Sequence, residues 1–232
     1  MKAFQQAFEL EVDGQMVSVD MKMMRRKSMR LSVTEQGVID LRVPVDAGKA
    51  DVLRFLQKHD DWLIERLRHH RQRQDRHLLE FQHLGQSLPL IRSDSIRRLE
   101  VMEDRVRVPS NWNDEQVLNA LDKWRRVFAR EEFSRQIDLW WPLFSQFAPA
   151  KPTLRVKKMR TRWGSLSTRG YINLNMALTQ MPGELIELVV VHELCHLKHM
   201  DHGKGFQALM SQALPDWRAR EKQLEEHARR LL

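Results

Sequence analysis

The sequence predicts an α+β fold, and three observations support this prediction. The first 45 residues alternate polar and apolar side chains between glycine-containing turns, which is typical of short strands. Residues 47–77 place apolar side chains at roughly helical spacing, with arginines on the polar face. Residues 185–191 are apolar almost all round, which is typical of a buried helix. We therefore expect a β-rich N-terminal region and a long helix to precede the region that contains the buried helix.

The N-terminal region is predicted to contain four strands. Asp13-Gly14, between the first two, is a strong hairpin signal because both residues tolerate the positive φ of a two-residue turn. Gln36-Gly37 separates the second pair, and Pro44 closes the region. The predicted strands are residues 8–12, 16–20, 31–34 and 39–43.

Short strands and a further helix are predicted in the middle of the chain. Residues 84–108 return to short alternating segments. A helix is expected from Asn113, where Asn113 and Gln116 resemble a capping box. It should run towards Trp140, with Pro142 breaking or ending it.

The C-terminal part follows a stiff connector, Pro-Ala-Lys-Pro at 149–152. Residues 153–159 and 171–175 are predicted strands, and Pro182 suits the first turn of the buried helix. A last, charged helix is expected after Pro215. We predict two domains. Residues 1–110 form a β-rich N-terminal subdomain with a basic helix at about 47–77, and residues 111–232 form a second domain that contains the candidate site.

Composition indicates a globular protein of the cytoplasm. Hydrophobic residues make up 42% of the 232 residues and charged residues 30%, as in ordinary folded domains. The start of the chain has no signal-peptide pattern, and no window approaches the ~18 apolar residues that span a bilayer. The single cysteine, Cys195, excludes an internal disulfide and is expected to be a small core residue.

The net charge of +8 allows two interpretations. It can mark a surface for nucleic acid or another acidic partner, or it can reflect solvated helix faces. The positive charge is densest on the basic helix, at Arg66, Arg68, Arg71, Arg73 and Arg76.

The strongest chemical signal is His192-Glu193-Leu194-Cys195-His196. In a helix, residues i and i+4 lie about 40° apart around the axis, so both imidazoles can reach one metal ion. Glu193 follows the first histidine, where its carboxylate can act on a metal-activated water as a general base. Because the preceding segment is buried, the histidines need a partner, which a metal would provide.

The third metal ligand is predicted to be His202. His199 shares the helix face but lies ~10 Å along the axis from His192, too far to share an ion with bonds of ~2 Å. His202 comes into range if the helix ends near Met200, which the glycine-containing run 201–205 favours. A carboxylate of the last helix is the alternative ligand: Glu221, Glu225 or Glu226.

Four segments together resemble the YgjP-like metallopeptidase family, a group of predicted metal-dependent hydrolases; they are Arg162-Trp163-Gly164-Ser165, Ile172-Asn173-Leu174-Asn175, residues 190–197 around the histidine motif, and His202-Gly203-Lys204-Gly205-Phe206. The resemblance implies a zincin-like catalytic domain, with zinc held by His192, His196 and His202 and with Glu193 as catalytic base. The family is similar to the SprT-like zinc metalloproteases, which act on protein attached to DNA. Leu166 departs from the pattern, since a cysteine commonly follows Trp-Gly-Ser.

The segment before the motif is a candidate substrate-binding segment. A strand beside the helix could pair with an extended peptide, and Gly164 would permit close approach. Alternatively, Trp163 anchors the core and Gly164 forms a bulge. The candidate substrate-binding residues are Arg162, Trp163, Gly164 and Ser165.

We therefore expect a zinc-dependent hydrolase of the metallopeptidase type acting on a peptide or protein, although another divalent metal would also suit the site. One alternative is a metal-dependent nucleotide pyrophosphatase or phosphohydrolase, with Arg160 and Arg162 clamping phosphates of a small substrate. Another is a nucleic-acid-associated protein, or a protease recruited to DNA, that binds through the basic helix.

Overall fold

The structure is a computed structural model that describes residues 5–34 and 36–231, except the side chains of 5, 73, 74, 76, 77, 230 and 231. The chain divides into two compact units, Met1–His77 and Leu78–Leu232. Both units combine helices and strands, so the α+β prediction is confirmed.

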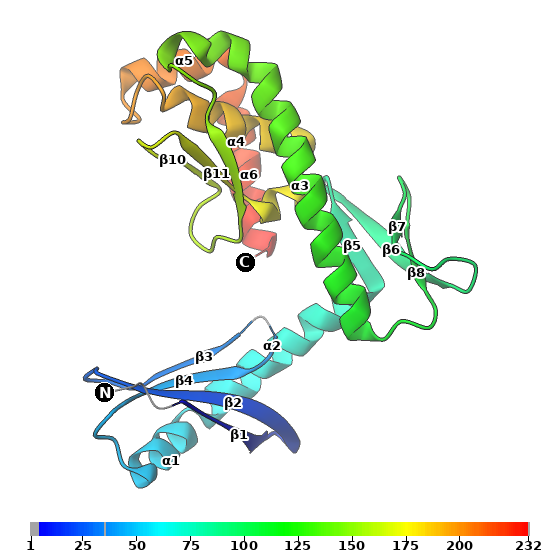
Figure 1. Ribbon diagram of the computed structural model, residues 1–232, viewed down its shortest axis with the longest axis vertical. Coiled ribbons are helices and arrows are strands. Elements are labelled where there is room, and N and C mark those ends of the chain that lie inside the picture. Colours follow the sequence, from blue (N-terminus) through cyan, green and yellow to red (C-terminus); the bar gives the residue numbers. More distant parts are fainter. Residues whose placement is uncertain (1–4, 35, 232) are drawn as a thin grey trace. The chain divides into compact units, whose positions relative to one another are not determined.

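The first unit is a four-stranded sheet in the order β1-β2-β4-β3 (Figure 1). A tight turn joins the first two strands, because Asp13 and Gly14 both adopt positive φ. β2 and β4 pair in parallel, and β3 pairs antiparallel with β4. All four predicted strands are confirmed, with bounds β1 (Gln5–Val12), β2 (Gln15–Met24), β3 (Arg30–Val33) and β4 (Ile39–Pro44).

Two helices rather than one follow this sheet. α1 (Lys49–Lys58) has His59 as its C-cap residue, and α2 (Asp60–Leu79) starts directly after His59. The ring of His59 bonds to the carbonyl oxygen of Phe55 through Nδ1 at 2.8 Å. The single helix predicted over residues 47–77 is therefore interrupted. Apolar side chains of both helices complete one core with the sheet: Val12, Val19, Ile39, Leu41, Val43, Leu56, Leu63 and Leu67.

The second unit starts with a sheet in the order β5-β6-β8-β7. Its strands are β5 (Glu80–His83), β6 (Gln86–Ser93), β7 (Glu100–Val101) and β8 (Val106–Pro109). Their buried side chains pack with Val117 and Leu121 of the next helix. The structure thus divides after residue 77, whereas the sequence prediction divides after 110, because this sheet shares its core with the helix that follows it.

That helix, α3 (Asp114–Phe144), has the predicted cap. The Asn113 side chain accepts a bond from the N–H of Gln116, and the Gln116 side chain accepts one from the N–H of Asn113, both at 2.9 Å. Pro142 lies inside the last turn and does not stop the helix, which ends two residues later. A short 3-10 helix, η1 (Ser145–Phe147), follows.

A three-stranded sheet and three more helices complete the second unit. The sheet order is β10-β11-β9, so β10 is an edge strand, antiparallel to β11. β9 pairs with β11 in parallel. The elements are β9 (Thr153–Lys157), β10 (Gly164–Leu166), β11 (Tyr171–Asn175), the 3-10 helix η2 (Met176–Gln180), α4 (Gly183–Cys195), α5 (Lys204–Ala213) and α6 (Trp217–Leu231).

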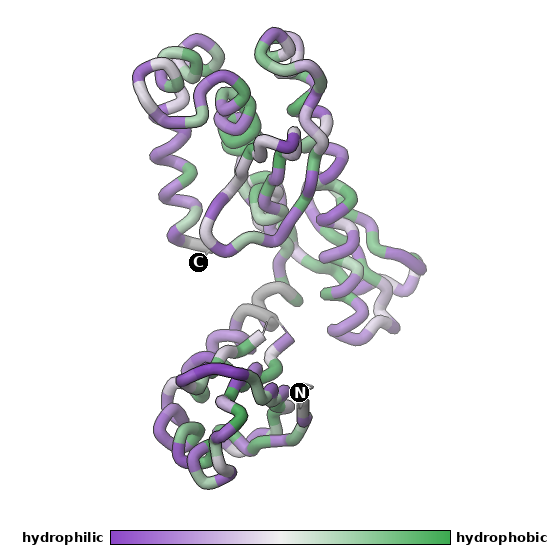
Figure 2. The backbone as a smooth tube through the Cα atoms, turned by 60° about the vertical axis from the view of Figure 1, so that its left-hand side comes forward, coloured by the Kyte–Doolittle hydropathy of each residue, from purple (hydrophilic) through white to green (hydrophobic). Residues whose placement is uncertain are grey.

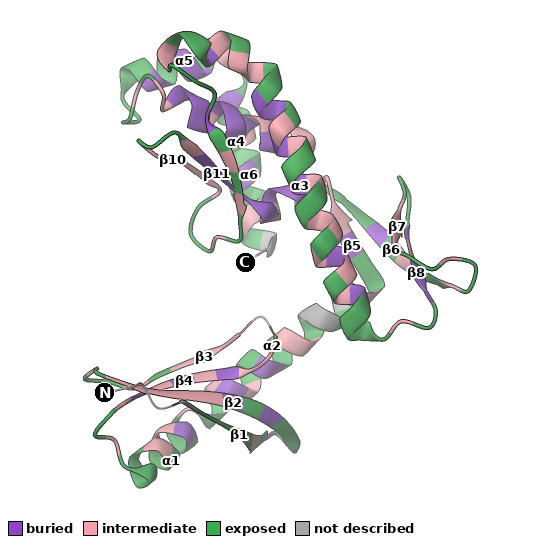
Figure 3. Cartoon of the chain, viewed as in Figure 1, coloured by how far each residue is buried: buried purple, intermediate pink, exposed green. Residues whose placement is uncertain are grey.

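The core of the second unit surrounds α4. In Figure 3, α4 and much of β11 are coloured as buried. The last helix, α6, is mainly hydrophilic in Figure 2, and it contributes Trp217 and Leu224 to the core. Glu187 links three helices, because it accepts bonds from Trp140 of α3 at 3.1 Å and from Arg220 of α6 at 2.5 Å. These contacts tie the N-terminal half of α4 to α3 and α6.

Candidate metal centre

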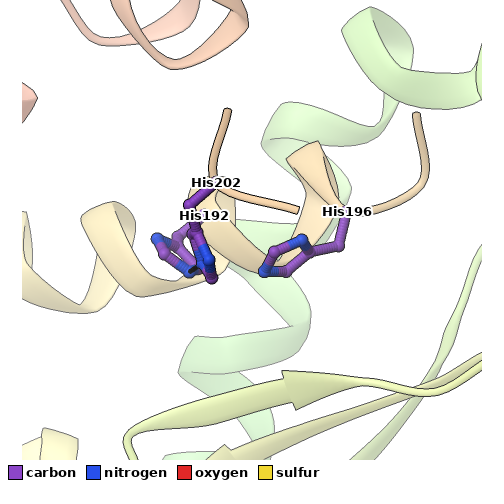
Figure 4. A group of neighbouring side chains, drawn as sticks. All are labelled: His192, His196 and His202. Carbon is purple, nitrogen blue, oxygen red and sulfur yellow. Dashed lines mark hydrogen bonds between the residues drawn. The ribbon is translucent and has the colours of Figure 1, made fainter. Parts of the chain in front are cut away.

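Three histidine rings gather at the C-terminal end of α4 (Figure 4). His192 lies in the last turn of the helix, His196 is its C-cap residue, and His202 comes from the loop before α5. The ring centroids are 5.1 Å apart for His192 and His196, 5.0 Å for His192 and His202, and 4.9 Å for His196 and His202. One nitrogen from each ring lies within 4.8 Å of the others. This spacing suits three ligands of one metal ion.

The end of α4 explains why His202 joins the group. The helix ends at Cys195 and α5 begins at Lys204, so the chain between them turns back and returns His202 to the first two histidines. The Nε2 atoms of His202 and His192 are 3.1 Å apart. Among the described residues, the cluster contains neither His199 nor a carboxylate of α6. The structure therefore brings together His192, His196 and His202, the three histidines that the sequence analysis proposed as ligands.

His196 is oriented by a backbone contact. Its Nδ1 lies 2.9 Å from the carbonyl oxygen of His199, which can only accept a hydrogen bond. Nδ1 therefore carries the proton, and the lone pair of Nε2 is free for a metal. The His199 ring packs on Gly205 instead, where an added Cβ would lie 2.6 Å from its Cε1 atom.

Phe206 forms an apolar backing for the cluster. Its ring centroid lies 4.9 Å from those of His192 and His196 and 4.8 Å from that of His202. Burial lowers the pKa of His192 to about 4, and the neighbouring His196 and His202 add to the shift. Neutral imidazole, the form that binds metal, is therefore favoured.

Glu193 is the one buried carboxylate in the described part of α4, with 5% of its surface exposed. Burial raises its pKa to about 7, while a hydrogen bond from the backbone of Leu166 and the charge of Arg162 act in the opposite direction. Its Oε2 atom is buried and has no hydrogen-bond partner among the described residues. A carboxylate with this pKa can exchange a proton near neutral pH.

The segment 162–165 lies beside Glu193 rather than apart from it. Gly164 directly contacts the Glu193 side chain. Trp163 is half-buried and packs against the core of the second unit, while Arg162 is exposed. Ser165 Oγ accepts a bond from Asn173 Nδ2 at 3.0 Å. The structure therefore places this segment beside the Glu193 side chain, with Arg162 exposed at the surface.

Two buried asparagines, which were not predicted to have a role, support this segment. Asn175 Nδ2 donates to the carbonyl oxygens of Met159 and Arg162, at 2.9 and 3.0 Å. Asn173 Nδ2 donates to the carbonyl oxygen and Oγ of Ser165. The detectable signal was two amides at i and i+2 of an otherwise apolar strand, which places both on one face.

The histidine cluster includes neither Cys195 nor any described side chain of the basic helix. Cys195 is fully buried, and burial raises the pKa of its thiol to about 12, so it is a core residue as predicted. On α2, Arg68 pairs with Asp13 at 3.7 Å, and the Arg66 guanidinium lies 5.7 Å from the Trp62 ring. The side chains of Arg73 and Arg76 lie outside the described residues.

Comparison with known proteins gives the class of the chain. A family model described as YgjP-like, metallopeptidase domain, matches residues 27–227. The chain belongs to the YgjP-like metallopeptidase family, as its motifs predicted, and is by class a metal-dependent hydrolase. No curated protein matches the chain. Within the described residues, no helix has both the length and the apolar character needed to cross a membrane.

The solved structures that resemble part of the chain include two metallopeptidase zymogens. Abylysin of Pyrococcus abyssi is 18% identical with a TM-score of 0.37, over 41% of this chain and 93% of that one. Jannalysin of Methanocaldococcus jannaschii is 17% identical with a TM-score of 0.37, over 41% of this chain and 96% of that one.

Proposed function

We propose that the chain is a zinc peptidase with His192, His196 and His202 as metal ligands and Glu193 as general base. The observation that carries this proposal is the cluster of three imidazole nitrogens within 4.8 Å of one another, on the helix that also supplies a buried glutamate. Three protein ligands leave a coordination position open, which is typical of catalytic rather than structural zinc.

The residues present fit a divalent ion of the zinc type. All three donors are imidazole nitrogens, which zinc binds well in tetrahedral sites, whereas magnesium and calcium prefer oxygen. The bond from His196 Nδ1 to the His199 carbonyl leaves Nε2 as the donor. When bound, the ion would lower the pKa of a water molecule and polarise a carbonyl group.

Glu193 would move the proton. Its pKa of about 7 lets the ionised carboxylate accept a proton from the attacking water and then return it to the leaving amine. The buried setting around the carboxylate strengthens its electrostatic effect on that proton. The product of this reaction is a cleaved peptide bond with a free amine and a free carboxylate.

The substrate would be a peptide or protein lying along β10. This strand is at the edge of its sheet, so one row of its backbone groups has no partner within the sheet. An extended peptide can add to such an edge through main-chain bonds, with sequence preference set by nearby side chains. Arg162, Trp163, Gly164 and Ser165 would contribute to this surface, with exposed Arg162 available to substrate side chains.

Phosphohydrolysis is a second candidate, favoured by one observation. Arg160 and Arg162 are both exposed just before β10 and could contact phosphate. Incubation of the purified protein with casein and with nucleoside triphosphates separates the two activities. Peptide products without phosphate release would support the peptidase, and the reverse would support the phosphohydrolase.

The decisive experiment compares Glu193→Gln with the unaltered chain. Gln keeps the size of the side chain but cannot take a proton, so metal content should be unchanged while casein cleavage falls by about 10²–10⁴-fold. Elemental analysis of both proteins identifies the metal and controls for its loss. Full activity of the variant would overturn the assignment of Glu193 as the base.

A further inference from the structure

Gly164 of β10 lies against the side chain of Glu193 of α4. We propose that Gly164 is a positioning residue for Glu193, because only a residue without a side chain leaves room for the carboxylate at this point of the edge strand. The inference rests on the proposed function in naming Glu193 as the base. It gives Gly164 a role beyond contact with a substrate.

The distances leave no space for any side chain at 164. A Cβ atom there would lie 2.5 Å from Glu193 Oε1, 2.8 Å from its Cγ and 2.9 Å from its Cδ. Carbon atoms in favourable contact are about 3.5–4.0 Å apart, so each of these distances is a clash. All three atoms belong to one side chain, and any larger residue at 164 must therefore displace Glu193.

Backbone conformation does not explain the glycine. Gly164 lacks the left-handed φ of the glycines that need it, which are Gly14, Gly37, Gly85 and Gly170. An alanine could adopt the backbone of 164 without strain. The requirement at this position is for space, and the space is filled by the Glu193 carboxylate.

Glu193 cannot easily retreat from an added side chain. It is buried, and its neighbours Leu194 and Cys195 are fully buried in the core. A hydrogen bond from the backbone of Leu166, the last residue of β10, also acts on its carboxylate. Thus Gly164 of β10 leaves space for the Glu193 side chain, and Leu166 of the same strand binds its carboxylate.

The strand cannot easily retreat either. The N–H of Asn175 donates to the carbonyl oxygen of Trp163 at 2.8 Å, just before Gly164. Asn173 Nδ2 donates to the carbonyl oxygen of Ser165 at 3.2 Å, just after it. Because β10 is tied to β11 on both sides of Gly164, a clash there falls mainly on the Glu193 side chain.

A double-mutant cycle in thermal unfolding of the chain of residues 1–232 tests this coupling without relying on activity. Gly164→Ala should lower the Tm of the unaltered chain. In the Glu193→Ala background the clashing atoms are gone, so Gly164→Ala should leave the Tm unchanged or raise it, since alanine restricts the unfolded chain. An equal drop in both backgrounds would overturn the proposal.

Gly183→Ala is the matched control, because an added Cβ at 183 meets no atom within 4 Å. It should shift the Tm by the same amount in the unaltered chain and in the Glu193→Ala background. A coupling to Glu193 as large as that of Gly164 would contradict a local contact and so overturn the assignment.

Peptidase kinetics give the second readout. Gly164→Ala should lower kcat by at least tenfold with KM and metal content unchanged, while Gly183→Ala keeps both constants. A rise in KM with unchanged kcat would overturn the positioning role and favour substrate contact. If Glu193→Gln also remains fully active, the proposed base is wrong, and the unfolding cycle still decides whether Gly164 positions the Glu193 side chain.

Discussion

Asn175 Nδ2 donates a hydrogen bond to the carbonyl oxygen of Arg162 at 3.0 Å, and so ties the strand before α4 to the segment that leads into β10. The same amide donates to Met159 and accepts a bond from the N–H of Ala177. Asn175 is only 4% exposed, so water cannot replace these bonds. One buried side chain therefore shapes the backbone on which Gly164 and Leu166 lie.

Replacing Asn175 with alanine should weaken both fold and activity. Backbone groups left buried without a partner cost about 1–3 kcal/mol, and the loss should appear in the free energy of unfolding by urea. Peptidase activity should fall too, because β10 is no longer fixed beside Glu193. Gln146→Ala is the control, since it removes an exposed bond to the Leu143 carbonyl and should change stability by less than about 0.5 kcal/mol. Equal effects of the two variants would contradict this role for Asn175.

His83 should make stability depend on pH. Burial lowers its pKa, and the charge of Arg125 lowers it further. As pH falls below the ordinary histidine value of about 6.5, the unfolded chain takes up a proton that the folded chain does not, so stability falls. His83→Phe should keep the contacts with the rings of Trp124 and Phe128, whose centroids lie 5.2 and 4.6 Å from that of His83. The substitution should remove the pH dependence that comes from His83. Urea unfolding at pH 7 and pH 5 measures the difference, and parallel pH curves for both proteins would contradict it.

Local signals predicted most of the first unit. The Asp13-Gly14 turn and strict alternation are short-range features, so the strands and their hairpin follow from the sequence. The break at His59 does not, because it depends on one side chain bonding to the preceding turn. Pro142 was likewise a weak guide, since it removes one backbone hydrogen bond and only two helical residues follow it.

The histidine cluster was predictable because it depends on the spacing of the histidines along the sequence. An i, i+4 pair on a helix and a glycine-containing run after it are enough to bring His202 back to His192. The support beneath Glu193 was not predictable in the same way. Gly164 and Leu166 contact Glu193 from 29 and 27 residues away along the chain, which no local pattern reveals. The spacing of Asn173 and Asn175 indicates a polar face of β11 but not the partners of Asn175, which are Met159 and Arg162.

The domain division leads to a prediction about truncation. Val117 and Leu121 of α3 share a core with Phe81 and Val106 of the preceding sheet. A chain starting at residue 111 would expose this apolar surface, at a cost of about 25 cal/mol per Å² of surface uncovered. A chain of residues 78–232 should therefore unfold cooperatively at a higher Tm than residues 111–232, which should aggregate. Equal stability of the two would contradict the packing of this sheet on α3.

Removing single histidines should separate metal ligands from their neighbours. His202→Ala takes away one of three ring nitrogens and should weaken zinc binding by more than about 100-fold, beyond the range typical of supporting residues. His199→Ala removes a ring that packs on Gly205 but keeps the backbone carbonyl that orients His196, so zinc should stay bound. Competition with a chelator measures both affinities. At a zinc concentration 100 times the Kd of His199→Ala, zinc should raise the free energy of unfolding of that variant by about 2.7 kcal/mol. The same zinc concentration should leave the free energy of unfolding of His202→Ala nearly unchanged, because that variant binds zinc much more weakly. The assignment would fail if the two variants bound zinc equally well, because the two rings are chemically identical and only that of His202 belongs to the cluster.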